Sequence, residues 1–293
     1  MCFTGCLSGI IGDWSSLSFK RNQTETFTQK VMLTIRFANG RVVIPVFINV
    51  WYKIAAKNIS NAQIQSQIDV LNKDFTATDS DFKNIPAQFA SLSTNVAITF
   101  ELVNAVRKPT TKTSWRIRDS NKNIKRRGIN LTSLSATLKI WACKIGRGIL
   151  DYAQFPGGCS ANDKVIIDSN YFGLSSAASY LYNLGRTASH EVVHWKNLSH
   201  ICGGTYSGND LVSDKPVHKT ANFDILWFID ISTCLPTHNG MTMNYLDYTD
   251  DSGMYMLTKG QKTRISALFL TGGARATLGV PFFKFLNSKL PSC

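Results

Sequence analysis

The sequence predicts one mixed α/β (α+β) domain over residues 41–285, preceded by an extension or remnant prosegment over residues 1–40. Three observations lead to this prediction: a buried-strand pattern followed by an amphipathic helix, several further strand patterns, and a helix that carries histidines. The chain is 44% hydrophobic and 17% charged, which supplies a core and excludes a disordered protein. No run approaches the roughly 18 apolar residues of a membrane span, so we expect none.

The first regular element is expected at residues 42–51, where β-branched and aromatic side chains follow one another as in a buried strand. Ser60 and Gln63 then have the spacing of a capping box, which marks the start of a helix. Apolar side chains recur at helical spacing after it, at Ile64, Ile68, Leu71 and Phe75. We therefore expect an amphipathic helix that backs the sheet.

Later elements follow from the same patterns. Alternation of apolar residues over 96–102 predicts a half-buried strand. Further strands are expected at 138–143, 149–155 and 165–168. Residues 207–242 are rich in Asn, Asp, Thr and Gly, which predicts a long irregular and functional segment. The domain is thus expected to have an upper part to about residue 200 and an irregular lower part over 201–285.

The chain is basic, with 32 Lys and Arg against 19 Asp and Glu and a formal net charge of +13. Residues 107–127 hold nine of these cations around Asp119, with Trp115 among them. This segment has two interpretations, a solvated loop at the edge of the sheet or a patch that binds nucleic acid or another polyanion. The loop is favoured because no nucleic-acid-binding motif accompanies the charges.

The histidines point to a metal. His190 and His194 are four residues apart, so both imidazoles lie on one helix face and can reach a single ion. His200 can supply a third nitrogen if the chain turns back at Asn197, a residue type that accepts positive φ. Three nitrogens leave zinc one open position for water, and Glu191 is placed to take a proton from that water.

A packed core helix is the alternative explanation of these histidines. It is disfavoured because three of the chain's five histidines fall within residues 190–200. A zinc site beside a carboxylate predicts hydrolysis, in which Glu191 accepts the water's proton and passes it to the leaving amine. The tetrahedral oxyanion needs one more donor, which residues 244–248 offer.

A family resemblance rests on two motifs, His190-Glu191-x-x-His194-x-x-Asn197-x-x-His200 and Asn244-Tyr245-Leu246-Asp247-Tyr248. Together they resemble the metzincin zinc peptidases, and more narrowly the pappalysin family. The resemblance covers about residues 41–280. It implies a metzincin-type catalytic domain with a twisted mixed sheet, a backing helix, an active-site helix and an irregular C-terminal subdomain.

The resemblance also implies roles, those of a zinc endopeptidase. Zinc would be held by His190, His194 and His200. Glu191 would be the general base and acid, and Tyr248 would stabilise the tetrahedral intermediate. A protein or peptide substrate would pair with the strand at 149–155. We expect a secreted monomer without nucleic-acid or membrane partners, although the start of the chain has no evident signal peptide.

Some positions depart from the family pattern. Calcium is the second metal that the resemblance implies, at Asp210 and Asp214. Lys215 replaces a threonine there and opposes a cation, so solvated acidic residues remain the alternative. Leu246 replaces the methionine beneath the zinc, a change that roughly keeps volume and apolarity.

Two alternatives concern activity. A catalytically impaired binding protein on the same scaffold would explain two departures from the family pattern. On the zinc helix, Val193 and Lys196 replace a usual Gly and a usual Leu. Among the cysteines, Cys234 lacks its family partner, with Cys202 as an alternative partner. The complete set of ligands and the retained base argue against it. Latency through a thiolate of Cys2 or Cys6 on zinc is a further hypothesis, set against a stray or truncated leader.

Overall fold

A computed structural model describes residues 14–32, 41–116, 137–157, 163–174, 180–203, 209–224 and 239–279. Its centre is a five-stranded sheet with the strand order β2-β1-β3-β5-β4. The strands are β1 (Val42–Tyr52), β2 (Ile98–Pro109), β3 (Leu138–Cys143), β4 (Asp151–Ala153) and β5 (Val165–Asp168). Only the β4–β5 pair of this sheet is antiparallel, so the predicted mixed sheet is confirmed and is mostly parallel.

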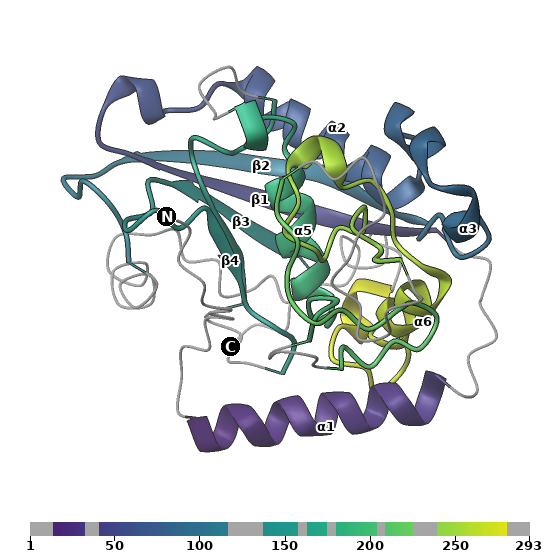
Figure 1. The fold of residues 1–293 in the computed structure, drawn as a ribbon. Helices are drawn as coiled ribbons and strands as arrows, with labels where there is room; N and C mark the ends of the chain where they lie inside the picture. The colour runs from purple at the N-terminus through teal and green to yellow at the C-terminus, as the bar shows by residue number, and fades with distance from the viewer. Residues whose placement is uncertain are drawn as a thin grey trace.

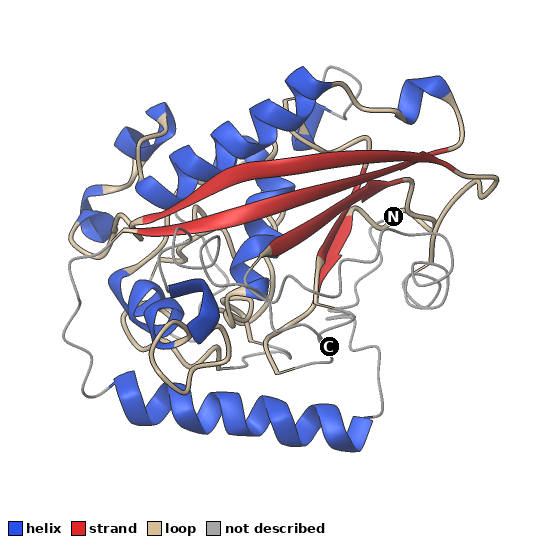
Figure 2. Ribbon diagram, turned by 180° about the vertical axis from the view of Figure 1, so that it is seen from behind, coloured by secondary structure: helices blue, strands red, loops and turns tan. Residues whose placement is uncertain are grey.

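The helices lie on one side of this sheet and below it. They are α1 (Trp14–Met32), α2 (Asn61–Thr76), α3 (Ala87–Ala90), α5 (Arg186–Trp195) and α6 (Lys259–Ala267). α2 packs on β2, α5 packs on β4 and β5, and the two helices contact each other (Figures 1 and 2). α1 lies away from the sheet, against α6 (Figure 1). No helix in the described ranges is long and apolar enough to span a membrane.

β1, β3 and β5 are largely buried on both faces, which explains their nearly continuous apolar sequence. Alternate residues of β1, from Ile44 to Val50, join α2 and α5 in one large core. The opposite face holds a tryptophan cluster, in which the ring of Trp51 lies 5.3 Å from that of Trp115 and 5.8 Å from that of Trp141. The sheet therefore separates the core that supports α5 from a second, aromatic core.

Helix α2 begins at the predicted place. The hydroxyl of Ser60 accepts the N–H of Gln63 at 3.1 Å, as the capping pattern predicts. The side chain of Gln63 instead donates to the carbonyl of Phe172 at 2.8 Å, so the capping box is only half formed. The four predicted apolar residues of this helix are all buried against the sheet.

Helix α1 was not predicted, because residues 1–40 show no apolar periodicity. Its buried positions explain why. Thr24 and Thr28 lie one turn apart and are buried, and Glu25 between them pairs with Arg264 of α6. A helix face made of threonines and an ion pair gives no hydrophobic signal in the sequence.

Among the remaining strands, β3 and β5 have the predicted bounds, and β2 and β4 have shifted ends. β2 begins two residues later than predicted and runs on to Pro109, and β4 is shorter than the predicted 149–155. Residues 209–224 form turns and extended chain without a helix or strand, in agreement with the predicted irregular segment. The part of that segment at 225–238 lies outside the described residues.

Candidate active site

Helix α5 places the first two histidines. It begins after Gly185, which has a φ of 78°, and all ten of its residues are buried. One carboxylate oxygen of Asp251 accepts the backbone N–H groups of Leu184 and Arg186, at 2.8 and 3.3 Å. These bonds satisfy N–H groups that a helix start leaves without partners, and they anchor this end of α5.

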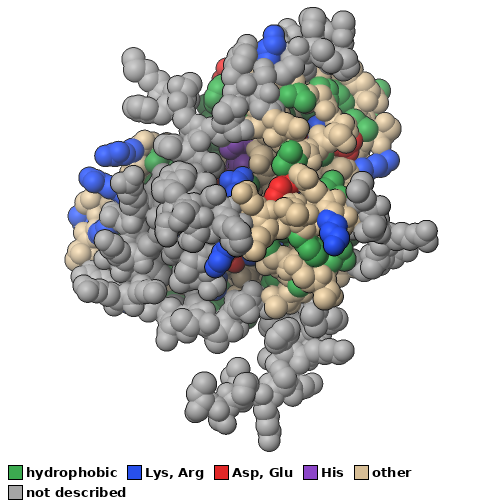
Figure 3. All heavy atoms as spheres, turned by 90° about the horizontal axis from the view of Figure 1, so that it is seen from below, with side chains coloured by type: hydrophobic (Ala, Val, Ile, Leu, Met, Phe, Trp, Pro, Cys, Tyr) green, Lys and Arg blue, Asp and Glu red, His purple; other side chains and the backbone are tan. Residues whose placement is uncertain are grey.

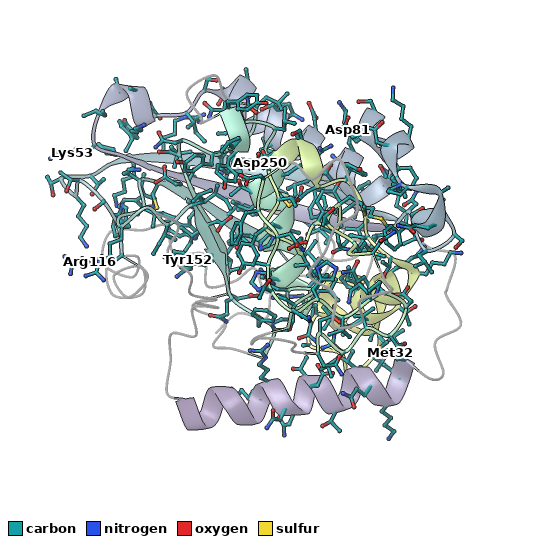
Figure 4. All side chains as sticks on the ribbon, in the orientation of Figure 1. Met32, Lys53, Asp81, Arg116, Tyr152 and Asp250 are labelled. Atoms are coloured by element: carbon teal, nitrogen blue, oxygen red, sulfur yellow. The ribbon has the colours of Figure 1, made fainter. Side chains whose placement is uncertain are left out.

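A partly buried ionic network surrounds the same end. The guanidinium of Arg186 lies 3.0 Å from Asp79 and 2.9 Å from Asp81, which Figure 4 labels near Asp250 at the top of the molecule. Asp74 of α2 accepts hydrogen bonds from the hydroxyl groups of Ser189 and Tyr245. Burial raises the pKa of Asp74 to about 6, against the opposing effect of Arg186.

The three predicted ligands meet at one point. The Nε2 atoms of His190, His194 and His200 lie 2.9–3.1 Å from one another. Asn197 makes this possible, because its φ of 68° turns the chain back toward α5, as predicted. The three side chains keep only 5–8% of their surface exposed, and histidine atoms are visible near the centre of the face in Figure 3.

The outer ring nitrogens fix the tautomers of the first two histidines. Nδ1 of His190 lies 2.6 Å from the carbonyl oxygen of Tyr245, and Nδ1 of His194 lies 2.7 Å from that of Leu198. A carbonyl can only accept, so both Nδ1 atoms carry the proton and both Nε2 atoms present lone pairs. Carbonyl partners of this kind orient metal-binding histidines.

The donor set fits a zinc ion. Burial lowers the pKa of His190 to about 4 and that of His194 to about 3, so both imidazoles are neutral near pH 7. Lone pairs that converge at this distance repel one another unless a cation lies between them. Three neutral nitrogens with one position left open are the ligands of a catalytic zinc site.

Glu191 contacts a second carboxyl group, that of Asp151, which the sequence did not predict. Its side chain is hydrogen-bonded to that of Asp151, on the edge strand β4. Burial and the adjacent Asp151 raise the pKa of Glu191 above the usual glutamate range. No sequence pattern links these residues, because their contact depends on how α5 packs against β4.

The residues of the second motif lie beneath and beside the histidines. Leu246 is fully buried, and its carbonyl accepts the N–H of Ile201, the residue after the third histidine, at 3.2 Å. The ring of Tyr248 stacks on His200 with centroids 4.6 Å apart. The Tyr248 hydroxyl lies 3.4 Å from Nδ1 of His200, at the edge of the histidine cluster.

The carboxylates predicted to bind calcium already have donors. The ammonium of Lys215 forms a buried ion pair with Asp210. Asp214 accepts the hydroxyl of Thr258 at 2.8 Å and the N–H of Gly260 at 2.6 Å, at the start of α6. These contacts do not fit a calcium site, because a lysine ammonium and two hydrogen-bond donors occupy the oxygens that the ion needs.

Two other predictions fall wholly or partly outside the described residues. Cys2, Cys6 and Cys234 are among the residues not described, so the latency and disulfide hypotheses remain predictions. Of the basic segment, residues 107–116 are described, and Figure 4 shows Arg116 and Lys53 at the same end of the sheet. The ammonium of Lys112 lies 4.7 Å from the ring of Trp115, a contact that suits a structural loop.

Known proteins resemble this chain over most of its length, although no family model matches it. An extracellular metalloprotease of Pyricularia oryzae is 31% identical over 228 residues, which are 73% of this chain and 69% of that protein. An extracellular metalloprotease of Colletotrichum graminicola is 32% identical over 244 residues, 78% of either chain.

Solved structures give the same result. Mature mirolysin of Tannerella forsythia, in complex with a cleaved peptide, matches with a TM-score of 0.79 and 36% identity over 85% of this chain and 100% of that chain. A promirolysin mutant of the same organism matches with a TM-score of 0.81 and 34% identity, over 91% of this chain and 96% of that one. On this similarity of sequence and fold, the chain belongs to the pappalysin family of metzincins and is a zinc metallopeptidase.

Proposed function

We propose that this chain is a secreted endopeptidase whose zinc ion is held by His190, His194 and His200. The observation that carries the proposal is the convergence of three Nε2 atoms, with the Nδ1 protons of the first two directed to carbonyls. Relatives named extracellular metalloproteases support action outside the cell. The substrates we propose are proteins or peptides, in keeping with the cleaved peptide in the mirolysin structure.

The chemistry divides between the metal and the chain. Zinc at this position would polarise the scissile carbonyl and lower the pKa of water. The charge of the zinc ion would also favour the ionised form of Glu191, against the effect of burial and Asp151. The Glu191 carboxylate accepts the proton of the attacking water and delivers it to the leaving amine. The Tyr248 hydroxyl, beside His200, donates a hydrogen bond to the developing oxyanion. Asp151 orients the Glu191 side chain through their shared hydrogen bond.

Substrate binding is proposed along β4. This strand is last in the order of the described sheet and pairs with β5. An extended peptide can add to the outer edge of such a strand through main-chain hydrogen bonds. β4 belongs to the upper part of the proposed domain over residues 41–285, and Tyr248 belongs to its lower part. A peptide paired with β4 would therefore run between the two parts, past the histidines.

Cleavage of a mixed peptide library tests this function. Purified protein supplied with zinc should cleave peptides, and the Glu191→Ala variant should lose at least about a thousandfold in kcat/KM while still binding zinc. Glu101→Ala is the matched control, because Glu101 is an exposed glutamate of β2, and it should cleave at the parent rate.

The outcomes separate the alternatives. Equal cleavage by the parent and Glu191→Ala would remove Glu191 from the mechanism. Zinc binding at one equivalent without cleavage by the parent would instead favour the catalytically impaired binding protein. Retained zinc affinity in His200→Ala would contradict the three-histidine site itself.

A further inference from the structure

Two arginines from the C-terminal part of the chain hold the end of the active-site helix. Nε of Arg264, on α6, donates to the carbonyl of Asn197 at 3.0 Å. Nε of Arg275 donates to the carbonyl of Trp195, also at 3.0 Å. Both arginines are nearly inaccessible, with 2% and 5% of their surface exposed. The two side chains therefore act within the fold and not at its surface.

Each guanidinium is fixed in turn by a carboxylate. Arg275 forms a two-point contact with Asp163, at 2.7 and 2.9 Å, and its guanidinium lies 3.5 Å from the centre of the Trp195 ring. Arg264 forms the same kind of contact with Glu25 of α1, at 2.8 Å for its first bond. A guanidinium that is paired with a carboxylate through two hydrogen bonds has a fixed orientation. Its Nε–H group is therefore held in the direction of the backbone carbonyl that it contacts.

The two carbonyls belong to the segment between His194 and His200, the second and third proposed zinc ligands. The last carbonyls of a helix have no partner within the helix, and the negative end of its dipole attracts cations. Here the chain leaves α5 through Asn197 in its left-handed conformation, and Leu198 next to it holds Nδ1 of His194. Displacement of this turn would move His200 away from the other two histidines.

We propose that Arg264 and Arg275 are positioning residues that fix this turn and so place His200 on the metal. Glu25 and Asp163 hold the two guanidiniums in position. The inference rests on the proposed zinc site, and it assigns α1 a supporting role in the metal centre. Partners that orient a metal ligand typically contribute tenfold to a hundredfold to metal affinity.

Zinc affinity of the Arg264→Gln variant tests the proposal. We expect a tenfold to hundredfold weaker zinc affinity, measured by competition with a chromophoric chelator. We also expect weaker visible absorption when Co²⁺ replaces zinc. Arg107→Gln is the matched control, because Arg107 also donates to a backbone carbonyl, that of Ile59 at 3.2 Å, at the opposite edge of the sheet from β4. Parent-like zinc affinity in Arg264→Gln would overturn the proposal.

A double-mutant cycle with His200→Ala separates positioning from general destabilisation. If Arg264 acts through His200, Arg264→Gln should not weaken zinc binding further once His200 is absent. An equal loss in both backgrounds would contradict the positioning role. Failure of the zinc site itself is distinguishable, because His200→Ala alone would then bind zinc like the parent.

Glu25→Gln gives a second test if Arg264→Gln does not fold. This change keeps the Arg264 bond to Asn197 and removes only the charge that holds the guanidinium. We expect zinc affinity to fall less in Glu25→Gln than in Arg264→Gln. Glu25→Asp keeps the carboxylate, so its zinc affinity should lie between those of Glu25→Gln and the parent. Unchanged affinity in Glu25→Gln would remove α1 from the positioning of the metal site.

Discussion

The two ends of α5 are held by side chains of opposite charge. At the first end, the carboxylate of Asp251 accepts two backbone N–H groups. At the other end, the guanidiniums of Arg264 and Arg275 donate to two backbone carbonyls. This arrangement matches the helix dipole, which favours negative charge at the start of a helix and positive charge at its end.

The difference between the ends lies in what each one holds. The first end binds α5 to α2 and to a partly buried ionic network, so we expect its residues to determine the stability of the fold. The other end holds the turn that brings in His200, so we expect its residues to determine metal affinity. The same helix thus has a structural half and a functional half.

The largest expected effect is at the first end. Asp251→Ala leaves the N–H groups of Leu184 and Arg186 without their acceptor, inside the protein. We expect the free energy of unfolding to fall by about 3 kcal/mol. Urea unfolding measures it, with the exposed Asp69→Ala as control. If zinc affinity of the folded variant falls as much as in Arg264→Gln, the division between the ends is wrong.

The next effect concerns pH. The pKa of Asp74 is about 6 in the fold against 3.8 in an unfolded chain, mainly because of burial. Its contribution to stability is therefore complete below about pH 4 and is lost as the pH rises through 6. Asp74→Asn removes this loss, so its stability relative to the parent should rise by about 2 kcal/mol between pH 4.5 and 7.5.

Unfolding in urea at both pH values checks this sign. Ser189→Ala is the control, because it removes the hydrogen bond to Asp74 and leaves the titrating group in place. A stability difference between Asp74→Asn and the parent that stays constant or falls with pH would contradict the raised pKa.

A smaller effect is expected at the turn. Asn197→Ala keeps a β-carbon at a φ of 68° but loses the short polar side chain that lets Asn adopt this conformation, which costs about 1 kcal/mol. Asn197→Gly accepts the same conformation and should keep nearly the parent stability in a urea titration. Loss of stability in both variants would show that the amide of Asn197 matters more than its backbone conformation.

The smallest effect concerns calcium. Because Lys215 already neutralises Asp210, added calcium should leave the melting temperature of the zinc-loaded protein unchanged. Lys215→Thr removes the internal cation and should make the melting temperature depend on calcium. A clear rise in the melting temperature of the parent with calcium would show that the ion displaces Lys215. The start of α6, the helix that carries Arg264, would then depend on calcium.

The local part of the site was predictable from the sequence. The spacing of His190 and His194 and the residue type at Asn197 are local signals, and the structure brings them together as expected. The supporting residues gave no such signal. Glu25 and Arg264 are 239 residues apart, and Asp163 and Arg275 are 112 apart. Only the packed fold brings these charges together, and α1 was missed for the same reason.

Arg264 and Arg275, which hold the turn, also imply an order in which the site is completed during synthesis. Arg264 and Arg275 come 67 and 80 residues after the carbonyls they hold. A ribosome synthesises the chain from its N-terminus, so a nascent chain can contain all three histidines before Arg264 and Arg275 have been made. Glu25 is made early and meets its arginine only then. The metal site would thus be completed late, after both arginines have followed the histidines out of the ribosome.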